Sequence, residues 1–234
     1  MVDQKLTLTL SPKKVVYFLG TIMIFLVITH VIGVLMKFVF GHNSVYGLVP
    51  FFNLDAEQNA PTFFSSCLFL INSILLFIMW KVREITDKRQ WIWLLLSGIS
   101  CFLAIDEFAE IHERFSEPVK LGIPISSFLD IAWVIPYGIG TVLLLTLITP
   151  FFRQINKKIR RWFGVSVLTY LTGALGFEMI GAWYVSTRPF DIVCGFLIMF
   201  EESLEMMGLI MLIYTLLSLL QSKCGKFEIV IPTS

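Results

Sequence analysis

Long apolar stretches alternate with short polar segments along almost the whole chain. Six of these stretches reach about the 20 apolar residues that a helix needs to cross a bilayer core. We expect all six to be helices, because an open strand would leave its backbone groups unsatisfied in lipid. The predicted spans are residues 15–39, 62–79, 91–111, 128–151, 162–185 and 192–220. The pattern therefore predicts an all-α, polytopic membrane protein, a six-helix bundle forming one integral membrane domain over residues 1–234.

Composition agrees with this pattern and excludes some partners. Hydrophobic residues make up 56% of the chain and charged residues only 15%, with a mean hydropathy of +0.81. The net charge of +1 gives no reason to expect a nucleic-acid partner. Membrane lipids are the expected surroundings.

Basic residues gather in alternate connections between the spans. They precede the first span, separate the second from the third and the fourth from the fifth, and follow the sixth. The positive-inside rule makes these regions cytoplasmic, so both termini are expected to face the cytoplasm. If the protein is bacterial, it is expected in the plasma (inner) membrane.

The longest connection on the other side, residues 40–61, contains Asp55 and Glu57. One interpretation is a solvated loop. The alternative is a lid or re-entrant segment that lends one of these carboxylates to a site opening outward.

Carboxylates are unusually frequent within or at the ends of the predicted spans, where no Lys or Arg lies deep. The group consists of Asp106, Glu107, Glu110, Glu113, Asp130, Glu178, Glu201, Glu202 and Glu205. Each ionised carboxylate at mid-membrane costs at least about 2.5 kcal/mol. Protons, metal ions or a cationic substrate must therefore compensate for this charge.

Helical phase arranges these carboxylates as faces. At about 100° per residue, Asp106, Glu110 and Glu113 share one stripe, with Glu107 on its shoulder. Glu201 and Glu205 share another, with Glu202 on its shoulder, and helix direction puts Glu178 at a similar depth. Nearby Gly173, Gly176 and Gly181 would let helices approach closely. His30 lies level with Asp106, either as a ligand or as a histidine bonded to a neighbouring helix.

Sites rich in carboxylates, with one or two imidazoles, suit hard or borderline divalent ions such as Fe, Mn, Mg or Zn. The Glu-x-x-His pair of dinuclear helical bundles is absent, since Ala109 stands three residues before His112. The predicted metal ligands are Asp106, Glu110, Glu178, Glu201, Glu205 and His30. Glu107, Glu113 and Glu202 are the candidates for a general base or for groups that support the ligands.

Two functions fit these residues. The first is a membrane metalloenzyme, an oxidoreductase or hydrolase, acting on a lipid or other apolar substrate that enters between helices. The alternative is a transporter of divalent cations, or of a cationic substrate driven by protons, working as a homo-oligomer. The similar motifs at Asp106–Glu110 and Glu201–Glu205, in halves of opposite orientation, favour transport. The lack of helix-breaking residues at both motifs counts against it. A non-catalytic assembly subunit would leave the acidic stripes unexplained.

Overall fold

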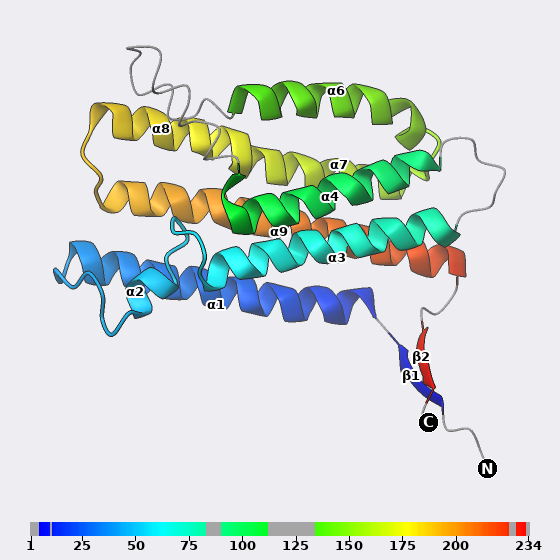
Figure 1. The fold of residues 1–234 in the computed structure, drawn as a ribbon, viewed down its shortest axis with the longest axis horizontal. Coiled ribbons are helices and arrows are strands. Elements are labelled where there is room, and N and C mark those ends of the chain that lie inside the picture. The colour runs from blue at the N-terminus through cyan, green and yellow to red at the C-terminus, as the bar shows by residue number, and fades with distance from the viewer. Residues whose placement is uncertain (1–4, 10, 83–89, 112–133, 225–227, 233–234) are drawn as a thin grey trace.

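Long helices lying nearly side by side form the body of the computed structural model (Figure 1). The structure describes residues 5–9, 11–82, 90–111, 134–224 and 228–232. Its helices are α1 Pro12–Phe38, α2 Leu48–Phe51, α3 Ala60–Val82, α4 Trp91–Ala109, α6 Val134–Phe152, α7 Lys157–Leu171, the π-helix η2 Thr172–Phe177, α8 Glu178–Thr187 and α9 Ile192–Cys224. Two short strands complete the described chain, β1 Lys5–Thr9 and β2 Glu228–Pro232.

All six predicted spans correspond to helices that are long and apolar enough to cross a membrane, which confirms a multi-pass membrane protein. The fifth span is a continuous helical segment, Lys157–Thr187, in which α7, η2 and α8 follow one another. Residues 128–133, at the start of the predicted fourth span, lie outside the described chain.

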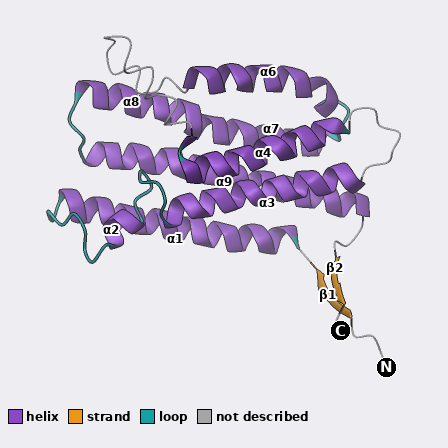
Figure 2. Cartoon of the chain, in the orientation of Figure 1, coloured by secondary structure: helices purple, strands orange, loops and turns teal. Residues whose placement is uncertain are grey.

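Both ends of the chain lie at the same end of the bundle, where β1 and β2 pair as an antiparallel two-stranded sheet (Figure 2). The register runs from Lys5 opposite Pro232 to Thr9 opposite Glu228. This pairing was not predicted, although the membrane-crossing body is helical as expected. We call the side of the bundle at the termini the terminal face and the opposite side the distal face.

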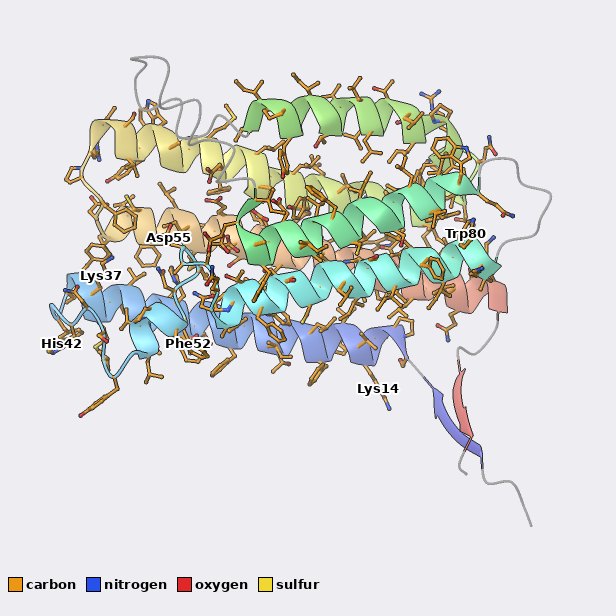
Figure 3. The ribbon with its side chains drawn as sticks, viewed as in Figure 1. Lys14, Lys37, His42, Phe52, Asp55 and Trp80 are labelled. Atoms are coloured by element: carbon orange, nitrogen blue, oxygen red, sulfur yellow. The ribbon has the colours of Figure 1, made fainter. Side chains whose placement is uncertain are left out.

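Basic side chains crowd the terminal face. The described ones on the helices there, and in the turn between α6 and α7, are Lys13, Lys14, Lys81, Arg153, Lys157, Lys158, Arg160, Arg161 and Lys223. Lys14 points away from the bundle, and Lys37 and His42 mark the distal end (Figure 3). The arrangement is the one that the positive-inside rule uses, and a cytoplasmic terminal face remains a prediction from that rule.

The core lies around α9, which packs against α1, α3 and α7. Its most deeply buried apolar side chains are Leu68, Met79, Met206, Ile213, Leu216 and Leu220. Serine hydroxyls join α3 to α4: Ser73 Oγ donates to Ser97 O and Ser97 Oγ donates to Ser73 O, both at 2.9 Å. Small polar residues of this kind let membrane helices approach closely and bond across the interface.

Helix α6 is attached mainly at one end. Its buried residues are Ile148, Phe151 and Phe152, and the two phenylalanines lie edge-on to Trp93 of α4. Towards the distal face α6 is exposed or half-buried. Among the described residues, few packing contacts therefore hold the distal end of α6.

Gly208 sets the separation between α7 and α9, which gives the first prediction. A Cβ at this position would lie 2.6 Å from Tyr170 N and 2.9 Å from Ser166 O, both backbone atoms that cannot rotate away. We expect Gly208→Ala to lower the free energy of unfolding by about 1–3 kcal/mol, because the helices must separate. Thermal unfolding in detergent measures the change. Gly20→Ala is the control, since a Cβ there meets nothing within 4 Å, and an unchanged melting temperature for Gly208→Ala would contradict the prediction.

Candidate functional site

An acidic cavity of about 500 Å³ lies inside the distal half of the bundle, between the α2–α3 loop, α4, α6, the α7–η2–α8 segment and α9. Along α9 it extends from Cys194 to Glu205, about 16 Å at 1.5 Å per residue. Eight carboxylates line it: Asp55, Glu57, Asp106, Glu107, Glu178, Glu201, Glu202 and Glu205. None of the described residues that line it is Lys, Arg or His. We call this space the acidic cavity.

Helix α9 contributes the largest group of these carboxylates, Glu201, Glu202 and Glu205. Glu201 makes a side-chain hydrogen bond with Glu178 of α8. Because an ionised carboxylate can only accept, this contact is favourable when a proton or a cation lies between the two groups. Glu205 accepts a hydrogen bond from the hydroxyl of Tyr170 on α7.

The π-helix η2 brings its segment very close to α9 just before Glu178. A Cβ on Gly173 would lie 2.6 Å from Glu201 O and 2.8 Å from Glu205 Cγ, so glycine is needed there. Gly176 and Gly181 have no comparable contact. Of the three glycines expected to permit close packing of helices, Gly173 is therefore the one at which two helical segments approach closely. Single π-turns inside α-helices occur frequently at functional sites.

Helix α4 supplies Asp106 and Glu107 and then ends. Asp106 is only 4% exposed and accepts a hydrogen bond of 3.0 Å from the hydroxyl of Tyr137 on α6. The helix stops at Ala109, and Glu110 adopts a left-handed conformation with φ of 55°. Its side chain leaves the acidic stripe and accepts from Gln58 Nε2 at 3.0 Å.

The predicted stripe of Asp106, Glu110 and Glu113 therefore does not form as a continuous helical face, because α4 ends one residue before Glu110. Glu110 is not among the residues lining the acidic cavity. Glu113, predicted as a catalytic candidate, lies outside the described residues, as do His112 and Asp130.

The α2–α3 loop brings both Asp55 and Glu57 to the acidic cavity, as expected of a loop that lends a carboxylate to a site, and its role as a lid remains a prediction. Figure 3 shows Asp55 on the part of the loop that lies beside the interior of the bundle. Asn59 fixes the loop, since its Nδ2 donates to Asn53 O at 2.6 Å and its Oδ1 accepts from Thr62 N at 3.2 Å. Asp55 is exposed at the mouth of the cavity, yet the surrounding protein displaces enough water from its carboxyl group to raise its pKa, and the influence of His30 and Lys37 opposes this shift.

His30 was predicted as a metal ligand, but it does not line the acidic cavity. It is 2% exposed, its Nδ1 accepts from Leu54 N at 3.0 Å, and its Nε2 lies 3.0 Å from Gly195 O. Since Nδ1 accepts, Nε2 carries the hydrogen and donates to the carbonyl. Both ring nitrogens are thus engaged by backbone groups, and His30 ties the loop to α1 and α9 beside the acidic cavity.

The carboxylates surround a space rather than a point. Within the described residues, no three His, Cys, Asp or Glu side chains converge closely enough to hold a metal ion in this conformation. Six of the residues predicted as metal ligands or catalytic groups line the cavity, namely Asp106, Glu107, Glu178, Glu201, Glu202 and Glu205. Binding a small ion would require some of these side chains to rotate towards one another.

Sequence reasoning missed the two tyrosines that contact the carboxylates. Tyr137 and Tyr170 both line the acidic cavity and donate to Asp106 and Glu205 respectively. The available signal was a tyrosine in an apolar span, whose hydroxyl needs a partner when it is buried. Which carboxylate each tyrosine would meet depends on how the helices pack.

A variant of His30 tests its structural role. His30→Leu leaves the buried N–H of Leu54 without a partner, so we expect the free energy of unfolding to fall by about 1–3 kcal/mol. Thr29→Val is the control, because the Thr29 hydroxyl bonds only within its own helix in the described structure. Thermal unfolding in detergent compares them. Unchanged stability of His30→Leu, together with loss of a bound metal, would instead identify His30 as a ligand.

The raised pKa of Asp55 predicts a definite dependence of stability on pH. Below its ordinary pKa of about 4 the carboxyl is protonated in both states, and its contribution to stability is complete. As the pH rises, the unfolded chain loses this proton first, so stability falls until the pH passes the raised pKa. We therefore expect Asp55→Asn to lose less stability than the parent between about pH 4 and pH 7, in thermal unfolding with chelator present.

Asp191 at the start of α9 provides a control of opposite sign. Desolvation acts to raise its pKa, but hydrogen bonds from Tyr184, Val193 and Cys194 outweigh it and the pKa is lowered. Its contribution is present above the ordinary pKa and is lost as the pH falls. Asp191→Asn should therefore lose less stability than the parent protein as the pH falls below about 4. An identical slope for Asp55→Asn and the parent above pH 4 would contradict the role of Asp55.

A comparison with known proteins identifies a family but no individual relative. No curated protein and no solved structure matches the chain. The family described as "Domain of unknown function (DUF8692)" matches residues 15–220, which include all six membrane-crossing helical segments almost completely. The chain is therefore a member of the DUF8692 family.

Proposed function

We propose that the acidic cavity binds a divalent metal ion and that the protein is a membrane metalloenzyme acting on a lipid or other apolar substrate. The observation that carries this proposal is the set of eight carboxylates around one cavity whose described lining contains no Lys, Arg or His. Four separate parts of the chain supply them, so the cluster is a product of the fold.

The charge balance is the first support. Carboxylates that line one cavity repel one another when they are ionised, and the surrounding helices keep bulk water away from most of them. A proton shared between Glu178 and Glu201 would neutralise one charge. A divalent ion would neutralise two more while replacing the lost hydration with carboxylate oxygens.

The donor set is the second support. Asp106, Glu178, Glu201 and Glu205 are the described carboxylates that we assign as ligands, and all four line the cavity. Oxygen donors suit Mg, Mn or Fe better than ions that prefer sulfur. Glu107 and Glu202 line the same cavity, and in this proposal they accept a proton from a substrate or from water. A metal ion would supply Lewis acidity or lower the pKa of bound water.

Packing below Glu205 supports an enzyme over a transporter. Fully buried side chains such as Ile213 and Leu216 lie between α9 and its neighbours there. A separate cavity on the terminal side, lined by Met79 and Tyr214 among others, shares no described lining residue with the acidic cavity. A site separated from the terminal side in this way suits a reaction supplied from the distal face or from the bilayer. The carboxyl pair Glu178–Glu201 suits the alternative, proton-coupled cation transport, because it can exchange its shared proton for a cation.

Metal analysis of detergent-purified protein tests the proposal. We expect close to one or two equivalents of Fe, Mn, Mg or Zn after dialysis, and at least a tenfold weaker retention in Glu205→Gln, since one lost anionic ligand costs about 1.4 kcal/mol or more. Glu110→Gln is the matched control, because Glu110 follows α4 but does not line the cavity.

The outcomes separate the two functions. Bound metal that is lost in Glu205→Gln and kept in Glu110→Gln supports the metalloenzyme. No metal in the parent protein, with pH-dependent cation uptake into proteoliposomes, supports transport instead. Equal metal content in all three proteins would show that the acidic cavity is not the binding site.

A further inference from the structure

A second cavity, almost entirely apolar, lies directly beside the acidic one. Its volume is about 430 Å³, within the range of small-molecule sites in proteins. It is bounded by α3 and α4 on one side, by α6 and α7 on the other, and by α9. Along α6 it extends from Tyr137 to Ile148, about 16 Å at 1.5 Å per residue. We call this space the apolar chamber.

The apolar chamber and the acidic cavity share part of their walls. The residues that line both are Phe69, Leu103, Tyr137, Thr141, Tyr170 and Leu171. Tyr137 and Tyr170 form the polar part of this boundary, with hydroxyls that donate to Asp106 and Glu205. Each tyrosine therefore lines the chamber while bonding to a carboxylate of the acidic cavity. The two spaces are therefore neighbours, one apolar and one acidic, on either side of a common boundary.

The contacts of α6 provide a route from the bilayer. Between its distal end and Ile148, α6 has no buried residue, whereas Ile148, Phe151 and Phe152 anchor its terminal end. A further apolar groove separates α6 from α7 on its other side, lined by residues such as Leu145, Val167 and Leu168. Within the described residues, displacing the distal part of α6 would break the Tyr137–Asp106 hydrogen bond but no contact of a fully buried α6 side chain, and it would open the chamber towards lipid.

We propose that the apolar chamber holds the hydrocarbon chain of an amphiphile, which enters from the bilayer between α4 and α6 and places its head at the acidic cavity. Its head is cationic or uncharged, because an anionic head would meet eight carboxylates and no basic group in the described lining. This inference rests on the proposed function and names the class of its substrate. The tyrosine hydroxyls mark where the chain ends and the head begins.

Probes with one chain and different heads test the inference. The protein is stripped of metal with a chelator, and native mass spectrometry in detergent measures binding of hexadecylamine, hexadecanol and hexadecanoate. We expect the amine and the alcohol to bind, and the anionic hexadecanoate to bind at least tenfold more weakly, because like charges brought together cost several kcal/mol. Equal binding of all three probes would overturn the choice of head group.

Adjacent leucines on α6 give a matched pair of variants. Leu144 lines the apolar chamber, whereas Leu143 is 66% exposed on the outside of the helix. Leu144→Trp should fill the chamber and weaken binding of the amine and the alcohol at least tenfold, and Leu143→Trp should leave it unchanged. Gly140→Leu is a second blocking variant, because Gly140 lines the chamber and a Cβ there meets nothing within 4 Å.

The result is independent of the metal measurement. Equal binding by the parent, Leu144→Trp and Gly140→Leu would overturn the chamber as the chain site, even if metal is retained. Loss of probe binding in both blocking variants, with Leu143→Trp unaffected, supports it even if no metal is found. The metal measurement tests the metal site, and the probe-binding measurement tests the apolar chamber, so the failure of one proposal can be told from the failure of the other.

Discussion

Carboxylates are gathered inside the bundle, at a cavity whose described lining contains no basic side chain to balance their charge. The rest of this structure depends on this constraint. Eight carboxylates line one cavity, and its described lining includes no Lys, Arg or His. They cannot all be ionised there without a positive partner, because hydration is limited and the charges repel. The fold meets part of this requirement with hydrogen bonds from Tyr137 and Tyr170 to carboxylates of the cavity. The remaining demand is the physical reason for expecting a cation.

Backbone features bring these groups together. The π-helix before Glu178 and the missing Cβ of Gly173 let that segment contact α9 at Glu201 and Glu205. His30 holds the α2–α3 loop through Leu54, and this keeps Asp55 beside the same cavity. Changes at Gly173 or His30 would therefore alter the site without touching a carboxylate. Such residues position the chemistry rather than perform it.

The apolar chamber beside the acidic cavity offers a space suited to hydrocarbon rather than to charge. One wall is α6, which is anchored at Phe151 and Phe152 and is largely unburied towards its distal end. The proposed entry past α6, together with the buried side chains below Glu205, suits a substrate that arrives dissolved in lipid. The two tyrosines between chamber and cavity would then separate the apolar part of the substrate from its reacting end.

The sequence by itself determined the membrane class, the six spans and most of the acidic group, because length, hydropathy and helical phase are local properties. Glu178, Glu201 and Glu205 were found in this way, and all three line the cavity. Phase failed where the helix ended: Glu110 lies beyond α4 in a left-handed conformation, so it leaves the stripe that a regular helix would give it. Only the tertiary structure decided that β1 pairs with β2, that His30 bonds to Leu54 and Gly195, and that the tyrosines face Asp106 and Glu205. Each of these contacts joins residues far apart in the chain, and local periodicity carries no information about which distant segment will pack against which.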